Sequence, residues 1–423
     1  MMACISATHI VKQRPGFAQT VRALPGSVIA SPVLGAYDPD PDYFFHWYRD
    51  SAVVIDALRL LAADGSAGTE ASARFGEFVR FSRALAALDG RKLAVPNSQR
   101  AGVAADFIRY LRDDAEMEAV HGEAVAAETR VNPDGTLDIS QWARPQHDGP
   151  PLRALAVLRW LEGMPLDATL HAEAAALLRA DLAFTRRWWH EPSFDIWEEE
   201  RGLHYYTLRA SAAALADGAP WLEAAGEHEE AMACRGQAEA ALHSLDRYWL
   251  SEAGYYRSRL LPGSEQSTKD LDISVILAAI HAGGSGAHGV HDPRMQATLA
   301  RLEGLFDADY PINHHRPAGT GPAMGRYAGD VYYSGGAYYF STLGAAEFCF
   351  RAAAGAPDPL VWIARGDGFL ATVRAYTPAD GALSEQFDQR SGAQTSAKQL
   401  AWSHAAFISC MAARRRVVGP KQL

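Results

Sequence analysis

Apolar residues recur at helical spacing along most of the chain. Between residues 48 and 64, Val54, Leu58 and Leu61 are three or four positions apart and therefore share one helix face. Alternating apolar and polar positions are scarce, and the best candidate for a strand is 251–261. The same helical spacing predicts further helices over 69–88, 150–163, 167–188, 204–220, 226–248, 270–281, 293–305, 333–354, 358–377 and 397–414, and another near 5–13. The pattern predicts an all-α protein of about twelve helices.

Long polar loops rich in aromatic residues follow roughly every second predicted helix. Loops of this composition usually carry function where a rigid scaffold presents them. Twelve helices, paired as six hairpins in a double ring, would present all these loops at one end, although periodicity alone indicates only the all-α class. The loops span 36–47, 132–148, 191–202, 262–270, 308–330 and 379–396.

Composition and charge exclude several classes of protein. No linker, repeat or low-complexity tract divides the 423 residues, so we expect a single domain over 1–423. The net charge of −10 argues against a nucleic-acid partner, and the basic run 414–416 is typical of a solvated helix end. Four isolated cysteines favour neither a disulfide framework nor a zinc site.

The N-terminal residues lack the continuous apolar region of a signal peptide, and no run is apolar enough to span a membrane. We therefore expect a cytoplasmic protein that does not bind membranes. A periplasmic or secreted location remains open if a signal peptide has been removed.

Five clusters combine aromatic residues with carboxylates and arginines. Aromatic rings cover the apolar faces of sugars, and an Arg–Asp pair such as Arg49–Asp50 can bind two hydroxyls. Each cluster also has a structural explanation, as a helix start, a cap, a solvated acidic face or a surface turn. The clusters lie at 43–50, 142–149, 194–202, 325–336 and 383–388.

Other catalytic motifs are missing from the sequence. It contains no HExxH motif, no P-loop or dinucleotide glycine pattern and no GxSxG elbow, so we expect no metal and no cofactor. Carboxylates and aromatic residues remain, and they are the chemistry of glycoside cleavage. Glu198 follows Trp197 directly, and an indole packed on a carboxyl would raise its pKa and keep it protonated as a general acid.

In order along the chain, these clusters resemble glycoside hydrolase family 15, the glucoamylases and their relatives. The matching segments are SPVLGAYDPDPDYFFHWYRDS, NPDGTLDISQWARPQHDGP, FDIWEEERG, YPINHHRPAGTGPAMGRYAGDVYYSGG and LSEQFDQRSGAQTSAKQLAWSHAA. The resemblance implies an (α/α)₆ barrel. It also implies an inverting, exo-acting α-glucosidase that releases β-glucose from the non-reducing ends of α-1,4-linked gluco-oligosaccharides, a small-molecule substrate.

The resemblance assigns roles to individual residues. It makes Glu198 the general acid and Glu385 the general base, which in an inverting enzyme stand about 6.5–9.5 Å apart to admit a water. It places Arg49, Asp50 and Arg326 on the terminal glucose, Tyr43 beside the reacting carbon and Glu199 at the next sugar. The full set of expected substrate-binding residues is Tyr43, Trp47, Arg49, Asp50, Trp142, Arg144, Trp197, Glu199, Arg326, Tyr332 and Trp402.

Several positions depart from the pattern of secreted fungal members. Tyr48 stands where they have Thr, Arg201 and Leu203 flank Gly202 after the acid loop, and Tyr338 replaces a Trp of the outer sugar sites. Another linkage, such as that of isomaltose or trehalose, is therefore an alternative, and so is a non-catalytic sugar-binding relative. We find no starch-binding domain, which favours small soluble substrates. The sequence does not indicate an oligomeric state.

Overall fold

The computed structural model describes residues 1–37, 39–95, 101–263, 267–284 and 286–419. The predicted loops 36–47 and 262–270 each contain positions outside these ranges. The α-helices are α1 (Tyr48–Ala63), α2 (Glu70–Leu85), α3 (Asp114–Glu118), α4 (Gly149–Gly163), α5 (Ala168–Trp188), α6 (Tyr205–Ala224), α7 (His228–Leu245), α8 (Ser274–Ala282), α9 (Pro293–Asp309), α10 (Tyr339–Ala353), α11 (Pro359–Ala375) and α12 (Ala401–Val418).

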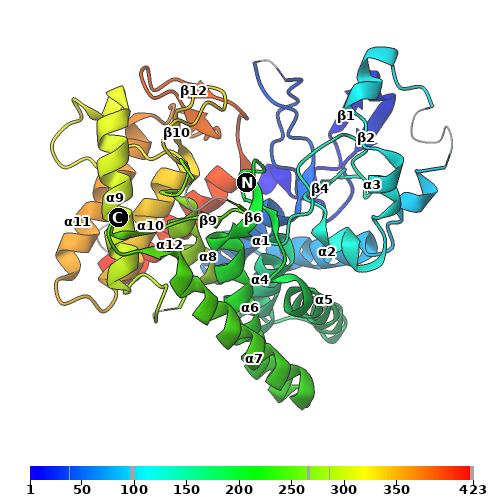
Figure 1. Ribbon diagram of the computed structural model, residues 1–423, viewed down its shortest axis with the longest axis horizontal. Coiled ribbons are helices and arrows are strands. Elements are labelled where there is room, and N and C mark those ends of the chain that lie inside the picture. The colour runs from blue at the N-terminus through cyan, green and yellow to red at the C-terminus, as the bar shows by residue number, and fades with distance from the viewer. Residues whose placement is uncertain (38, 96–100, 264–266, 285, 420–423) are drawn as a thin grey trace.

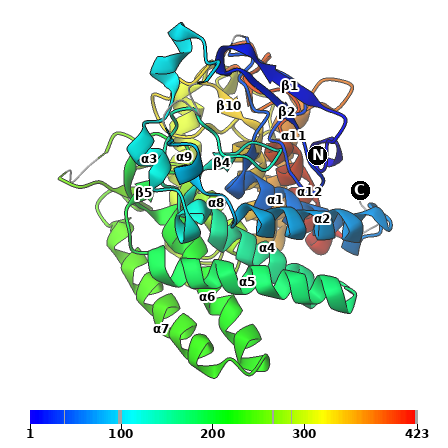
Figure 2. The same cartoon turned by 90° about the vertical axis from the view of Figure 1, so that its right-hand side faces the viewer.

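Six helices form a closed inner ring. Going round it, α1, α4, α6, α8, α10 and α12 each pack against the next, and α12 packs against α1. Every residue of α8 except His281 is buried. The sequence of this helix is apolar on all sides, as expected for a helix that other helices and loops surround. Helices α2, α5, α7, α9 and α11 pack outside the ring, each against the inner helix that precedes it (Figures 1 and 2).

This alternation confirms the predicted (α/α)₆ barrel and explains where the loops gather. Each outer helix returns the chain, so the loops before successive inner helices meet at one end of the ring. In Figure 1 the short strands β4, β10 and β12 lie toward the upper end and α7 extends at the lower one. Of the expected hairpins, the described part of the chain forms five, and α12 closes the inner ring without an outer partner of its own.

Strands are short and occur in the loops and at the N-terminus. They pair antiparallel as β1 with β2, β3 with β4, β5 with β6 and β9, β7 with β8, and β10 with β11 and β12. Their bounds are β1 (Val11–Arg14), β2 (Gln19–Arg22), β3 (His46–Trp47), β4 (Arg130–Val131), β5 (Ser193–Phe194), β6 (Arg201–His204), β7 (Trp249–Leu250), β8 (Tyr255–Tyr256), β9 (Arg259–Leu260), β10 (Ala337–Tyr338), β11 (Gln386–Phe387) and β12 (Gln394–Thr395).

The predicted helix near 5–13 is wrong. This stretch contains a bridge and the strand β1, which pairs with β2 as a hairpin around Pro15 and a left-handed Ala18. The burial of β1 alternates, with Lys12 and Arg14 facing inward, where both contact Asp42. Strand pairing and these inward ion pairs outweigh the few apolar positions that suggested a helix.

The other boundaries differ where a strand precedes a helix. The predicted helix over 333–354 begins only at Tyr339, because 337–338 pair with β11. The predicted strand 251–261 is divided between β8 and β9, which pair with different partners. No helix within the described ranges is both long and apolar enough to cross a bilayer.

Candidate active site

A cavity of about 250 Å³ lies where the loops before the inner helices meet. Every predicted site residue except Arg144 lines it, and four further side chains complete it: Ile196, Tyr338, Phe340 and Leu400. The lining residues come from the chain before and at the start of α1, α4, α6, α10 and α12, so the double ring brings together segments that are far apart in the sequence. No group of three or more metal-binding side chains occurs among the residues that the structure describes.

The Glu198 carboxylate accepts three N–H donors. The Trp47 indole and the Arg49 guanidinium donate to Oε1 at 2.8 and 3.0 Å, and the Trp142 indole donates to Oε2. Trp197, expected to pack on this carboxyl, instead donates its indole N–H to Asp272 at 2.8 Å and stacks on Phe340. Two other indoles thus hold Glu198, and they do so through their polar edges.

A rigid turn places Glu198. Its backbone φ is 65°, in the left-handed region that disfavours residues with a side chain. The Asp195 carboxylate accepts the backbone N–H groups of Trp197, Glu199 and Glu200 at 2.9–3.2 Å. Arg259, 2% exposed, donates to the same carboxylate and to Glu200. This buried network keeps the acid loop in a conformation that the local sequence alone would not favour.

Glu385 has a different environment. Its carboxylate accepts the Tyr43 hydroxyl at 3.2 Å and the Ser396 hydroxyl, and the residue is 9% exposed. The Tyr43 hydroxyl also bonds that of Tyr332 at 2.9 Å. Burial raises the pKa of Glu385 to about 7, although the Ser396 hydrogen bond and the charge of Arg326 act in the opposite direction.

Arg49 and Asp50 lie together at the bottom of the cavity. Arg49, 3% exposed, donates to Asp148 and to Glu198, and its Nε is 3.6 Å from the Asp50 carboxylate. Asp50 Oδ2 is buried and has no hydrogen-bond partner among the described residues. Burial raises the pKa of Asp50 to about 6. A buried carboxylate oxygen without a hydrogen bond in a pocket wall suits a neutral ligand that can donate a hydroxyl proton.

Arg326 and Glu199 form a second ion pair at the pocket wall. The Arg326 guanidinium binds both oxygens of Asp330 and donates to Glu199 at 3.0 Å. Lys269 and Tyr327 donate to the other oxygen of Glu199 at 2.7 and 2.5 Å. The charge of Arg326 and these hydrogen bonds lower the pKa of Glu199, so it stays ionised.

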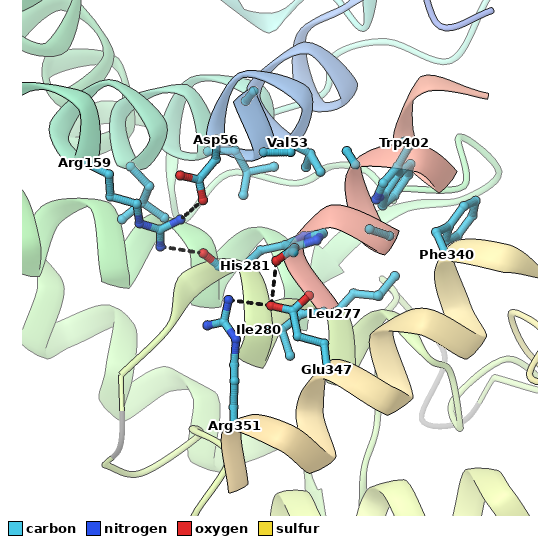
Figure 3. A pocket seen from close by; sticks show the side chains of 17 residues that line it. Val53, Asp56, Arg159, Leu277, Ile280, His281, Phe340, Glu347, Arg351 and Trp402 are labelled. Atoms are coloured by element: carbon cyan, nitrogen blue, oxygen red, sulfur yellow. Dashed lines mark hydrogen bonds and ion pairs between the residues drawn. The ribbon is translucent and has the colours of Figure 1, made fainter. Parts of the chain in front are cut away.

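An aromatic layer supports the cavity from below. Trp402 stacks on Phe340 with ring centroids 4.3 Å apart and planes 6° apart, and both side chains also line a smaller cavity inside the ring (Figure 3). Figure 3 shows Arg159 paired with Asp56 and Arg351 paired with Glu347 around that space. Its volume of about 30 Å³ has room for water but not for a sugar.

Arg144 is the one predicted site residue that lies elsewhere. Its guanidinium is buried and donates to Glu128 at 2.8 Å, to Asp138 at 3.0 Å and to the Ser140 carbonyl. The two carboxylates neutralise it and turn it away from the cavity. Arg144 therefore holds the loop that carries Trp142.

The expected departures affect the cavity unequally. Tyr338 lines it and accepts a hydrogen bond from Gln386 at 2.7 Å. Tyr48 points behind the site, beneath the Arg153 guanidinium, and Leu203 belongs to strand β6, which pairs with β9. Only Tyr338 among these positions reaches the sugar-sized space.

Ser396 and Lys269 were missed as functional residues. Both contact a predicted site carboxylate, yet each lies in a segment whose spacing gave no sign of that contact. Ser396 has a φ of 61°, which directs its hydroxyl to Glu385. The only available signal was its place within the segment that resembles the family's base region.

Comparison with known proteins agrees with this geometry. The model of the family described as Glycosyl hydrolases family 15 matches residues 14–84, 126–364 and 354–412. The chain belongs to glycoside hydrolase family 15. This family-15 chain is 30% identical to a glucoamylase of Neurospora crassa over 456 aligned residues, which cover 94% of the chain and 65% of that relative. It thus spans just under two thirds of the relative's length.

Other glucoamylases are similar to it over most of its length. A probable glucoamylase of Schizosaccharomyces pombe is 28% identical, with 93% of this chain and 86% of the relative covered. Among solved structures, the family-15 glucoamylase of Hypocrea jecorina superposes with a TM-score of 0.76 at 27% identity, over 94% of this chain and 68% of that one.

Proposed function

We propose that this family-15 protein is an inverting, exo-acting α-glucosidase that releases β-glucose from the non-reducing ends of α-1,4-linked gluco-oligosaccharides. The observation that carries the proposal is one sugar-sized cavity in which two of the lining carboxylates, Glu198 and Glu385, have unlike environments. The similarity to glucoamylases supports the choice of glucose and of the α-1,4 linkage.

Glu198 is suited to protonate the leaving group. Trp142, which donates to its Oε2, is 37% exposed and therefore marks the mouth of the cavity, where the rest of the oligosaccharide leaves. Trp47 and Arg49 hold Oε1, so the transferable proton is carried on Oε2. That proton passes to the glycosidic oxygen as the bond to the anomeric carbon breaks.

Glu385 is suited to activate water. Glu385 is 9% exposed, against 37% for Trp142 at the mouth, and two hydroxyl donors hold its carboxylate in place. A water hydrogen-bonded to it loses a proton to the carboxylate while its oxygen attacks the anomeric carbon from the face opposite the leaving group. An α-linkage then gives β-glucose, and Glu198 ends ionised while Glu385 ends protonated.

Arg49, Asp50 and Arg326 would bind the hydroxyls of the terminal glucose. Asp50 Oδ2 accepts one hydroxyl, and Trp402 and Tyr43 cover the sugar's apolar faces. The aromatic layer of Trp402 and Phe340 closes the cavity beneath the sugar. A closed bottom restricts the site to a chain end, which makes cleavage exo-acting.

The test is to incubate the enzyme with maltose, maltotriose, isomaltose, trehalose and nigerose and to follow the first product by proton NMR. β-Glucose appearing first from maltose and maltotriose is the expected result. β-Glucose from only one of the other disaccharides would move the specificity to that linkage, for which Tyr338 is the lining residue to examine. Initial α-glucose from maltotriose, whose reducing end leaves as maltose, would refute inversion.

A further inference from the structure

A second pocket lies at the base of the β5–β6 hairpin, the hairpin that carries Glu198. Its volume is about 160 Å³, and no described side chain lines both this pocket and the active-site cavity. Residues 196–199 at the tip of the hairpin line the cavity, whereas Ser193 and residues 202–204 at its base line the pocket. The ends of α5 and α7 and the first turn of α6 form the other walls. A ligand in the pocket would therefore contact the hairpin of the general acid without entering the active site.

Two buried hydroxyl groups in the pocket wall have no hydrogen-bond partner among the described residues. They belong to Thr207, which is 5% exposed, and Tyr248, which is 1% exposed. Buried polar groups are nearly always hydrogen-bonded, because a buried hydroxyl without a partner is costly. Thr207 lies on α6 and Tyr248 on the 3-10 helix Asp246–Tyr248, so a ligand that bonds both hydroxyls would join two elements of the pocket wall.

The rest of the lining combines apolar surface with further hydroxyl groups. Trp189, Leu203 and Leu208 supply the apolar surface. The indole N–H of Trp189 is already donated to Gln237 at 2.5 Å, so its ring presents carbon to the pocket. The Ser244 hydroxyl donates within its own helix and can still accept a bond. Hydroxyl groups beside apolar surface are complementary to a monosaccharide, which has hydroxyl rims and carbon faces.

The interior of the pocket is uncharged. His204 is buried and bonds the Ser193 carbonyl through Nε2 at 3.1 Å, and burial lowers its pKa, so the imidazole is neutral at neutral pH. The charged side chains of the lining, such as Arg247, are exposed. An anion in the interior would lose its water without gaining a buried cation, which favours a neutral ligand over a phosphate or a carboxylate.

We propose that this pocket is a second, non-catalytic site for one monosaccharide, and that its occupancy stabilises the β5–β6 hairpin and with it the position of Glu198. Sugar hydroxyls bond Thr207 and Tyr248, and sugar carbon packs on Trp189 and Leu203. The choice of glucose rests on the proposed function, which would supply it as product, whereas the preference for a neutral polyol rests on the lining alone. Accumulated product would then stabilise the loop of the general acid.

Hydrogen exchange with and without glucose tests the site. Segment 241–250 contributes to the pocket and not to the active-site cavity. We expect glucose to slow its exchange in the wild type and equally in Asp50→Asn, in which the active site binds glucose more weakly. Unchanged exchange of 241–250 even at molar glucose would overturn the proposal. Slowing that disappears in Asp50→Asn would assign the effect to the active site and would also overturn it.

The double variant Thr207→Val with Tyr248→Phe removes both hydroxyls and keeps the shapes of the side chains. We expect the Kd for glucose, from exchange of 241–250, to rise about ten- to thirtyfold, the usual value of two neutral hydrogen bonds. Ser341→Ala is the matched control, because the Ser341 hydroxyl is also buried without a partner among the described residues and lies on α10. An unchanged Kd in the double variant, or an equal rise in the control, would overturn the proposal.

Stability shows whether the double variant is a fair test. Neither hydroxyl is bonded to a described residue in the free protein, so urea unfolding should show no loss of stability. A marked loss would show that the hydroxyls serve the fold and would remove their role as ligand contacts.

Two further comparisons separate the possible failures. Slowing of 241–250 by inorganic phosphate and not by glucose would refute the neutral ligand. Neither Glu198 nor Glu385 lines the pocket, so binding of glucose there stands even if the NMR experiment assigns another linkage. Hydrolysis of maltose as proposed, without any response of 241–250, would refute the pocket alone.

Discussion

The loops that carry Glu198 and Glu385 hold their carboxylates by different means. Glu198 accepts two indole N–H groups and a guanidinium, whereas Glu385 accepts the hydroxyls of Tyr43 and Ser396 and is almost fully buried. N–H donors and a cation fix the direction of a carboxyl group near the mouth. Hydroxyls in a buried site can both donate and accept, so they can follow a change of protonation. The two environments therefore suit different proton transfers.

Removal of either carboxyl group should have the largest effect on turnover, and it would test the difference between the two environments. Glu198→Gln and Glu385→Gln should each lower turnover of maltose about 10²–10⁴-fold, the usual value of general acid–base assistance. α-Glucosyl fluoride distinguishes them, because fluoride leaves without a proton. Glu198→Gln should hydrolyse it at close to the wild-type rate, and Glu385→Gln should not.

Glu191→Gln serves as the control, since Glu191 is an exposed carboxylate at the surface after α5. The reverse pattern with the fluoride would exchange the roles of acid and base. Wild-type turnover of maltose by both variants would remove the catalytic assignment altogether.

A smaller effect concerns pH. Glu385 must be ionised to act as a base, and burial raises its pKa to about 7, so kcat/KM should fall as the pH drops below about 7. The Ser396 hydroxyl stabilises the charged form, so Ser396→Ala should raise this pKa further and move the acid limb to higher pH.

The pH profile of kcat/KM measures this limb. Ser391→Ala provides a comparison, because Ser391 bonds Asp388 on the exposed side of the same segment. If Ser396→Ala lowers the rate equally at every pH and leaves the limb in place, the hydroxyl supports structure and does not tune the base.

The smallest effect is on stability. The pKa of Glu385 is about 7 in the folded protein against 4.5 for the free side chain, so the folded state binds more protons across that window. Wild-type Glu385 costs no stability below pH 4.5, where it is protonated in both the folded and the unfolded state. The free energy of unfolding then falls as the pH rises from 4.5 toward 7. Glu385→Gln should therefore raise the free energy of unfolding by roughly 1–3 kcal/mol at pH 8 and change little at pH 4.

Urea unfolding at both pH values tests this, with the exposed Glu252→Gln as control. A variant that is less stable than wild type at pH 8 would show that Glu385 is not a destabilising buried charge.

The sequence was most informative where each signal is local. Apolar spacing located the inner and outer helices because burial on one face repeats every three or four residues. It could not close the ring, since closure depends on α12 meeting α1 across almost the whole chain. The (α/α)₆ expectation rested on resemblance.

The candidate site shows the same division. Twelve of the thirteen predicted site residues line one cavity because their clusters precede inner helices. Arg144 was misplaced because its local composition matches that of Trp142, whereas its orientation is set by Glu128 and Asp138. Lys269 was missed because its partner Glu199 lies 70 residues away in the sequence. Ser396 was missed because its contact with Glu385, 11 residues earlier, goes with a left-handed backbone that spacing does not indicate.

The left-handed backbone of Glu198 has a consequence for protein engineering. Glycine adopts this conformation without penalty and asparagine does so more readily than glutamate. A library varied at position 198 and sorted only for thermal resistance would therefore enrich Gly and Asn, and every enriched clone would lack the proton donor. Selection of a more thermostable variant of this protein therefore requires that Glu198 be kept constant while the surrounding residues are varied.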